Sequence, residues 1–205
     1  MKSVLPLVGL LFFVVSHALC ATPQETVREF QEGKVIKFSV LGHAKAKGAN
    51  FSIKYPQSWM AKEGERPNVV QNFVSDNGKG FEMTMILTKA IPPDEPLSEA
   101  DILNYFSSQG LADFVPQGGK FLRASSTKIE AEPAGLFEYT QRQQRAGMEI
   151  EMHIMGLAFF QGRTLVTVMC GVYGSSAGEA SRRFELFRPL FSIMLNSIIF
   201  DGKWK

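Results

Sequence analysis

Cysteine is scarce in this chain, which has only two among its 205 residues, Cys20 and Cys170. If an export leader ends at Cys20, one cysteine remains and the mature chain cannot form an internal disulfide. Cys170 lies within an apolar run, residues 165–172, and free cysteine is among the residue types most often buried. We therefore expect Cys170 to be a small core residue and not a nucleophile.

A large excess of charge of either sign is also absent. The chain has 22 basic and 20 acidic residues, a formal net charge of +2, and acidic residues dilute its short basic clusters. Proteins that bind nucleic acid usually present a strongly basic face, so this balance predicts no nucleic-acid partner. The aromatic content comes mainly from 17 phenylalanines, which favour core packing over ligand stacking.

A second apolar stretch long enough to span a membrane is missing, and the one at the N-terminus is typical of an export signal. Lys2 precedes it, and small residues follow at the positions that precede a cleavage site. The run is short for a bilayer, and no stop-transfer pattern follows. We expect a signal peptide over residues 1–20, cleaved between Cys20 and Ala21, with cleavage after Ala18 as the alternative. The mature protein is then periplasmic or secreted, with no transmembrane span.

Cys20 supports a second interpretation of the same residues. As a lipidated N-terminus it would tether the protein to a membrane by acyl chains. Lipoprotein processing prefers a small residue before that cysteine, where this chain has Leu19, and an aliphatic residue where it has His17. Simple export is the favoured interpretation, and a lipid anchor at Cys20 is the alternative.

Sequence periodicity predicts three helices and two groups of strands. The predicted helices are residues 22–31, 98–109 and 176–200. The predicted strands are residues 35–41, 51–55, 69–74, 81–88, 121–130, 135–143, 148–160 and 164–173. Ser98 and Asp101 form a capping signature, and Gly110 is the expected left-handed cap at the end of that helix. Pro189 predicts a kink or a new start within the last helix.

The order of elements predicts the fold class. Turn signals at residues 77–78 and 161–162 join neighbouring strands into hairpins. No polar linker and no internal repeat divides the chain. We expect an N-terminal segment, residues 21–34, with a short helix, and then a single domain over residues 35–205. Its fold is predicted to be α+β, an α/β/α sandwich around a central, mostly antiparallel sheet.

Three segments carry a resemblance to a known superfamily. Residues 51–59 read Phe-Ser-Ile-Lys-Tyr-Pro-Gln-Ser-Trp, which resembles the strand, Tyr-Pro, two residues, Trp signature of PsbP-like, Mog1-like and DcrB-like proteins. Residues 129–139 are similar to the start of their mid-chain strand, and residues 187–197 to their closing helix. The resemblance covers residues 35–200 and implies an α/β/α sandwich. Its members range from photosystem II extrinsic subunits to a Ran-binding nuclear factor and periplasmic lipoproteins, so the fold does not select a function.

Two features are candidate interaction sites. Trp59 follows a predicted strand, where it either covers the end of the sheet or offers a ligand platform, and the structural role is favoured. Pro92 and Pro93 lie in a stiff proline-rich loop, residues 91–96. This loop and residues 61–68 are the loops that we expect to contact a partner, because binding residues concentrate on loops held by a rigid scaffold.

Glu149, Glu151 and His153 alternate along one predicted strand and therefore share a face. Side chains on one face lie about 7 Å apart along a strand, too far to converge on one ion without a neighbouring strand. The favoured interpretation is a solvated face that pairs with Arg142 or Arg163 across the sheet. A metal site or a hydrolase that uses these three residues is the alternative.

Several recognisable catalytic motifs are missing, namely a His-Glu-x-x-His helix, a Walker loop and a Gly-x-Gly-x-x-Gly segment after a strand. The glycine-rich residues 171–178 are interpreted as a turn in which Ser176 caps the last helix. Neither His43 nor His153 has a recognisable nucleophile nearby in the sequence. The sequence therefore favours a non-catalytic, exported accessory or protein-binding module without a cofactor, whose partner is an envelope or secreted protein.

Overall fold

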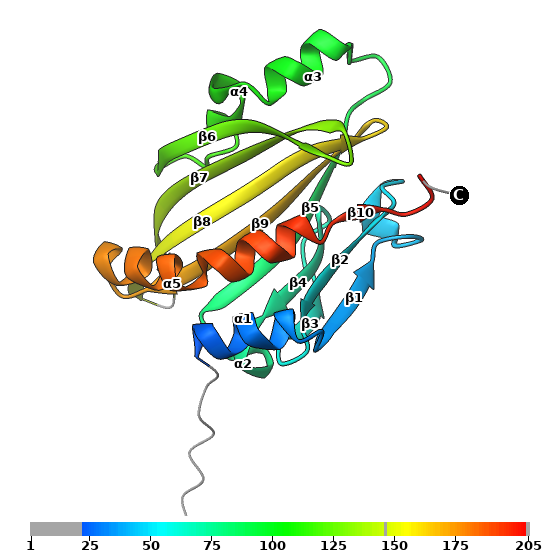
Figure 1. Ribbon diagram of the computed structural model, residues 1–205. Helices are drawn as coiled ribbons and strands as arrows, with labels where there is room; N and C mark the ends of the chain where they lie inside the picture. The colour runs from blue at the N-terminus through cyan, green and yellow to red at the C-terminus, as the bar shows by residue number, and fades with distance from the viewer. Residues whose placement is uncertain (1–21, 146, 204–205) are drawn as a thin grey trace, which may run out of the picture.

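The chain folds into two antiparallel sheets, with helices on both sides of the larger sheet (Figure 1). The computed structural model describes residues 22–145 and 147–203. The predicted signal peptide, residues 1–20, its cleavage site at Cys20 and Ala21, and the alternative lipid anchor at Cys20 lie outside the described residues.

The larger sheet has seven strands and the smaller sheet has three. In spatial order the larger sheet consists of β3 (Met60–Glu63), β4 (Val69–Val74), β5 (Glu82–Ala90), β9 (Thr164–Gly174), β8 (Met148–Gln161), β7 (Glu132–Arg145) and β6 (Gly119–Ile129). The smaller sheet consists of β1 (Val35–Ser39), β2 (Phe51–Pro56) and β10 (Ile199–Phe200). The helices are α1 (Pro23–Gln31), α2 (Ser75–Gly78), α3 (Glu99–Tyr105), α4 (Ser108–Ala112) and α5 (Ala177–Asn196), with a short 3-10 helix, η1 (Ala44–Ala46).

The strand pairs of the described residues are all antiparallel. Side chains on a strand alternate between faces, and β5 shows the result, because every second residue of its first seven is buried. With helices on both faces of the larger sheet, this arrangement confirms the predicted α+β fold, an α/β/α sandwich around a mostly antiparallel sheet.

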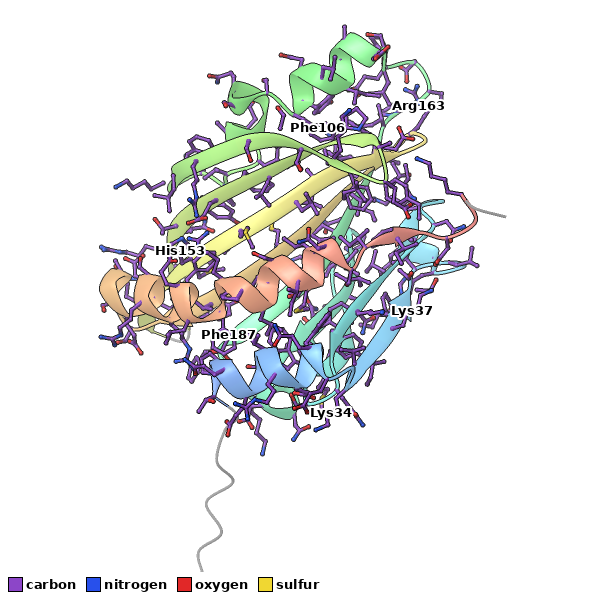
Figure 2. All side chains as sticks on the ribbon, in the orientation of Figure 1. Lys34, Lys37, Phe106, His153, Arg163 and Phe187 are labelled. Carbon is purple, nitrogen blue, oxygen red and sulfur yellow. The ribbon has the colours of Figure 1, made fainter. Side chains whose placement is uncertain are left out.

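Different helices cover the two faces of the larger sheet. α5 and α1 lie on the face that is shared with the smaller sheet, and the main core there includes the fully buried Phe184 and Phe191 of α5. α3 and α4 lie on the opposite face, over a second core that contains Phe106 and Leu111. Figure 2 shows Phe106 and Phe187 on these two opposite sides. Each face of the sheet therefore has its own apolar core.

A second capping serine splits the predicted middle helix. The capping signature at its start is confirmed, because the Ser98 hydroxyl oxygen accepts a hydrogen bond from the Asp101 amide at 3.2 Å. The predicted end is wrong: α3 stops at Tyr105, and α4 starts after Ser107, whose oxygen accepts from the Gly110 amide at 3.1 Å. Gly110 therefore lies inside α4 and is not a left-handed cap.

The last helix starts where the sequence predicts and ends earlier. The Ser176 hydroxyl oxygen accepts from the Glu179 amide at 3.2 Å, and α5 continues past the exposed Pro189 as one helix. The predicted end at Phe200 is wrong, because α5 stops at Asn196 and the next residues pair with β2 as β10. Ile199 and Phe200 pair with the open edge of β2, and the helical periodicity of the preceding residues gives no sign of this pairing. None of the described helices has both the length and the apolar character needed to cross a membrane.

The sequence did not predict β3, most of which lies in residues 61–68, a segment expected to be a surface loop. The four residues of β3 are all exposed, so the strand has no alternation of apolar and polar residues to detect. It is defined only by its pairing with β4. The predicted hairpin between β4 and β5 is confirmed. Its turn needs left-handed backbone, which Asp76 and Asn77 adopt with φ of 48° and 51°.

Candidate interaction groove

Arg142 of β7 pairs with two members of the predicted row on β8. It forms ion pairs with Glu149 at 2.6 Å and with Glu151 at 2.7 Å, which confirms the predicted pairing with this arginine. The prediction of a solvated face is wrong for the other end of the row. Glu149 is exposed, whereas Glu151 and His153 are only 8% and 5% exposed. The sequence did not show that α5 packs on this face of the sheet.

Arg163 takes no part in that row. It lies in the turn between β8 and β9 (Figure 2) and donates hydrogen bonds to the Pro92 and Glu95 carbonyl oxygens. The predicted pairing with Arg163 is therefore wrong, and this arginine instead holds the proline-rich loop, where Pro92 and Pro93 are exposed. Trp59, the other candidate interaction residue, is 4% exposed and packs in the main core, so it offers almost no surface to a ligand.

His153 is buried between β7 and α5. Its Nε2 atom lies 2.8 Å from Glu138 Oε1, and its ring stacks on Phe184 of α5 with a centroid distance of 3.9 Å. Nδ1 is buried and has no hydrogen-bond partner among the described residues. A neutral imidazole that carries its hydrogen on Nε2 fits both observations, because it donates to Glu138 and leaves no N–H group unsatisfied.

Metal ligands are not assembled around this histidine. Among residues 22–145 and 147–203, no group of three His, Cys, Asp or Glu side chains is arranged to hold a metal ion. Glu151 is committed to Arg142, and His153 to Glu138. The structure therefore does not bring the three residues of the predicted row together on one centre.

Glu138 is the centre of a buried polar cluster that sequence reasoning did not single out. Its side chain is 7% exposed. Arg123 of β6 donates to Oε2 through Nε at 3.0 Å and Nη2 at 2.8 Å. Arg188 of α5 donates to Oε2 at 2.8 Å and to Oε1 at 2.9 Å. Together with His153, these groups engage both carboxylate oxygens, so the cluster ties α5 and the edge strand β6 to β7 and β8.

The surroundings of Glu138 favour its ionised form. Burial alone would raise the pKa of this carboxyl group, but the hydrogen bonds from His153, Arg188 and Arg123 outweigh that effect and hold the pKa well below its usual range. A carboxylate whose oxygens are all engaged is poorly placed to accept a proton from a substrate. The cluster is therefore built to position α5 and not to act as a general base.

Acid is expected to destabilise the protein through Glu138. Because its pKa is lower in the folded state than the ordinary 4.5, the ionised carboxylate stabilises the fold above that value, and this stabilisation is lost as the pH falls below about 4.5. Urea denaturation in steps between about pH 7 and pH 3 measures the loss. The Glu138→Gln variant should lose less stability over that interval than the unaltered protein. If the two proteins lose the same unfolding free energy between about pH 7 and pH 3, other carboxylates are responsible for the acid sensitivity.

A second buried carboxylate holds the first half of α5. Glu82 of β5 is 2% exposed and accepts hydrogen bonds from Arg183 of α5 and, at 2.6 Å, from the Ser75 hydroxyl group. Arg183 and Arg188 lie on the same helix and reach different strands of the sheet. The position of α5 over the sheet is therefore fixed by two buried ion pairs as well as by its apolar residues.

A groove runs between α5 and the β6 edge of the sheet. One cavity of about 380 Å³ lies beside the polar cluster and is lined by Arg123, Glu138 and Arg188. A second cavity of about 490 Å³ extends toward the end of α5. The two cavities share Leu136, Met155 and Ser192 in their linings, so they form one groove. Figure 1 shows α5 lying along β8 and β9, with β7 and β6 further from the helix.

The groove has an apolar floor and walls of mixed polarity. Its floor is formed by Leu136 of β7 together with Met155 and Leu157 of β8. One wall is α5, where the half-buried Ser192 lines both cavities. The other wall is β6, which contributes among others Ser125. A site of this shape fits apolar groups of a ligand or of a partner protein, with polar groups at its rim.

Cys170 has the core role that the sequence predicts. It is fully buried on β9, and the Thr84 hydroxyl group lies 3.3 Å from its sulfur atom. Burial raises the pKa of the Cys170 thiol to about 12. A thiol without appreciable thiolate is a poor nucleophile, so Cys170 is a packing residue.

One catalytic spacing escaped the sequence analysis. Residues 174–178 read Gly-Ser-Ser-Ala-Gly, the Gly-x-Ser-x-Gly spacing of a nucleophile elbow, between a strand and a helix. The structure gives Ser176 a different role, because its oxygen caps α5 by accepting from the Glu179 amide. Its backbone, with φ of −150° and ψ of 160°, is extended and lacks the strained turn of such an elbow. Ser176 is thus a capping residue, as the sequence analysis expects.

The arrangement of sheets and helices is similar to that of cyanobacterial PsbP (CyanoP) from Synechocystis, with a TM-score of 0.52 and 18% identity over 82% of this chain and 92% of that chain. The chain has the PsbP-like fold. This confirms the predicted PsbP/Mog1-like resemblance at the level of the fold, while its DcrB-like part stays a prediction. At such low identity the PsbP-like fold does not by itself select a function.

Two other solved structures have lower TM-scores. They are the Ran-binding protein Mog1p of Saccharomyces cerevisiae (TM-score 0.46, 10% identity, 81% of this chain and 95% of that chain) and LpqN of Mycobacterium tuberculosis, involved in cell envelope biogenesis (0.47, 10%, 86% and 96%). No protein-family model matches the chain, and no curated protein matches it in sequence.

The sequence holds signals for the polar cluster that the analysis did not use. Glu138 is a charged residue inside the apolar alternation of a long predicted strand, and Arg188 adjoins the phenylalanine stripe of the last helix. A charged residue at a position that should be buried needs a partner of opposite charge. That rule would have singled out both residues, although it could not have paired them without the topology of the PsbP-like fold.

Proposed function

We propose that this protein is an exported, non-catalytic accessory module that binds a protein partner along the groove between α5 and β6. The observation that carries the proposal is the groove itself, with its apolar floor and an exposed strand as one wall. Phe121 and Leu122 lie on that strand and are 36% and 39% exposed. Neither residue lines the cavities, but exposed apolar side chains on the strand that forms one wall of an apolar groove are typical of a protein-binding surface.

The chemistry of the described residues supports a binding role over a catalytic one. Glu138 is held ionised by three donors, His153 is buried against Phe184, and Cys170 keeps its proton. Each of these groups already has a structural task. Glu138 lines the groove, but both of its carboxylate oxygens are engaged by donors. A hydrolase or metal-binding protein that uses Glu149, Glu151 and His153 has less support, since these residues do not converge.

Export belongs to the same proposal and rests on the N-terminal sequence. The signal-peptide pattern over residues 1–20 supports a periplasmic or secreted protein. A lipid anchor at Cys20 is the alternative, and it would place the same groove next to a membrane surface. In both cases the partner is a protein of the envelope or of the exported fraction.

Filling the groove is expected to abolish partner binding. In the Ser192→Trp variant an indole ring occupies the space above Leu136 and Met155, so a partner that inserts side chains there is excluded. The matched control is Leu103→Trp, which adds the same side chain to an exposed position of α3 on the opposite face. Both variants and the unaltered protein are used to capture partners from envelope extract.

The proposal predicts a specific result for each variant. A protein that is captured by the unaltered chain and by Leu103→Trp should be lost with Ser192→Trp. Circular dichroism and urea denaturation establish that both variants fold. Capture that survives in Ser192→Trp, or that is lost instead when the loops at residues 61–68 and 91–96 are altered, would place the binding surface elsewhere.

A further inference from the structure

β6 is a long strand with one unpaired side. Among the residues that the structure describes, it pairs only with β7, and it ends the seven-stranded sheet. The strand has 11 residues, and Ile129 is its only buried residue. The opposite edge, β3, has only 4 residues. An edge strand presents a row of free backbone N–H and C=O groups that another strand can pair with, and a short edge limits such pairing. β6 is therefore the edge of this sheet best able to accept another strand.

The charges on β6 have one sign. The strand carries Lys120, Arg123 and Lys128 and no acidic residue. Arg123 is engaged with Glu138, but the exposed Lys120 and Lys128 appear in none of the ion pairs formed by the described residues. The outer edge of β6 is thus basic, with Lys120 and Lys128 near its two ends and on opposite faces of the sheet.

The acidic residues of the adjoining turn contact the C-terminal segment of the chain. Glu132 pairs with Lys203 at 2.7 Å, and Glu130 accepts a hydrogen bond from the Phe200 amide at 2.9 Å. Both carboxylates are therefore engaged with the C-terminal segment of the chain. Lys120 and Lys128 are thus available to carboxylates of another molecule.

A second copy of this chain is a poor occupant of the edge. Two β6 strands that pair with each other bring only positive charges together, because the strand has no acidic residue in any register. Like charges directly opposite each other destabilise a strand pair, whereas opposite charges stabilise it. Lysine on an edge strand is a common means of preventing self-association, and the same residues favour an acidic strand.

We propose that β6 is the docking edge for an extended, acidic segment of a partner protein, which adds to the sheet as an eighth strand. Backbone hydrogen bonds to β6 supply affinity, and the alternating side chains of the segment supply specificity. Carboxylates of the segment pair with Lys120 and Lys128, and its apolar residues contact Phe121 and Leu122. This inference rests on the proposed function, because it names the partner chemistry of the same surface.

A synthetic peptide tests the inference directly. The probe is a fluorescent peptide of about ten residues, a typical strand length, with valines at its centre and two adjacent glutamates at each end. Adjacent residues of a strand point to opposite faces, so the probe offers a carboxylate to Lys120 on one face of the sheet and to Lys128 on the other. Its binding to the full protein is followed by fluorescence anisotropy. Binding should weaken as salt is added. It should also fall at least about tenfold in the double variant Lys120→Glu/Lys128→Glu, because two attractive charge pairs become repulsive.

Two controls separate strand pairing from general charge attraction. The double variant Lys54→Glu/Lys79→Glu makes the same change in net charge at exposed lysines away from β6 and should bind the probe about as well as the unaltered protein. A probe that is N-methylated at its central amides keeps its charges and loses its backbone donors, so it should not bind. Equal losses in both double variants, or unchanged binding of the methylated probe, would overturn the inference.

A failure of the strand-addition inference can be distinguished from a failure of the proposed function. If Ser192→Trp abolishes partner capture while Lys120→Glu/Lys128→Glu leaves both capture and probe binding unchanged, the groove binds a partner and the strand-addition inference is wrong. Sedimentation of the unaltered protein provides the other test. A dimer that dissociates when β6 is altered would make a second copy the occupant of the edge, contrary to the inference.

Discussion

The Glu138→Ala variant is expected to lose about 3–5 kcal/mol of its free energy of unfolding. The substitution leaves Arg188 and His153 without the carboxylate that they share, and removing one partner from a buried ion pair is far more costly than the pair's net contribution. Arg123 is more exposed, so water can replace part of its interaction. Urea denaturation at neutral pH measures the change.

Glu185 provides the matched control, because it binds the same arginine from the exposed side of α5. Its carboxylate lies 2.7 Å from Arg188, and its side chain is 59% exposed. Glu185→Ala should therefore cost less than about 1 kcal/mol, as is usual for a surface ion pair. Similar losses in Glu138→Ala and Glu185→Ala would mean that the buried cluster is not what holds α5 to the sheet.

The Phe184→Ala variant is expected to lose a similar amount, about 3–5 kcal/mol. The Phe184 ring is fully buried, stacks on His153 and lies 4.6 Å below the Arg188 guanidinium group. Its removal leaves a cavity between α5 and the sheet and takes away the surface on which the polar cluster packs. Thermal and urea denaturation both measure the loss.

Leu186 is the control for this second prediction. It lies two residues further along α5 and is 46% exposed, so Leu186→Ala should change the stability by about 0.5 kcal/mol or less. The Phe184→Ala variant should also become less acid-sensitive, because the His153 and Arg188 donors to Glu138 lose their support. If Phe184→Ala loses as little unfolding free energy as Leu186→Ala, other contacts hold α5 to the sheet.

Most of the longer strands were predictable because they alternate or are continuously apolar over a typical strand length. Residues 164–173 form an apolar run and residues 81–88 alternate, and both appear as β9 and β5. Helix starts were predictable for a different reason, since Ser98 and Ser176 carry local capping chemistry that is complete within one turn. Features encoded within a few residues were therefore accessible from the sequence.

The errors concern features that depend on tertiary contacts. β10 exists because the edge of β2 accepts two residues that follow α5, and β3 exists only through its pairing with β4. His153 was expected at a solvated face because the sequence does not say which helix packs on which face of the sheet. The burial of His153 and the partners of Glu138 follow from the placement of α5, which no local pattern specifies.

The groove could not be predicted for the same reason. Its floor and its two walls come from β7, β8, α5 and β6, and the sequence gives no distance between these elements. The sequence suggested surface loops as the binding region, because loops are where binding residues concentrate. The structure offers a strand edge and a groove beside it, which are features of the sheet itself.

Hydrogen exchange on the protein, with and without a partner captured from envelope extract, tests the central claim most directly. A partner that adds a strand to β6 engages its free backbone amides and covers the groove beside it, so the account predicts new protection of amides in Gly119–Ile129 and along the α5 residues that face the groove. Protection confined to residues 61–68 and 91–96, with β6 amides exchanging as fast as in the free protein, would contradict it.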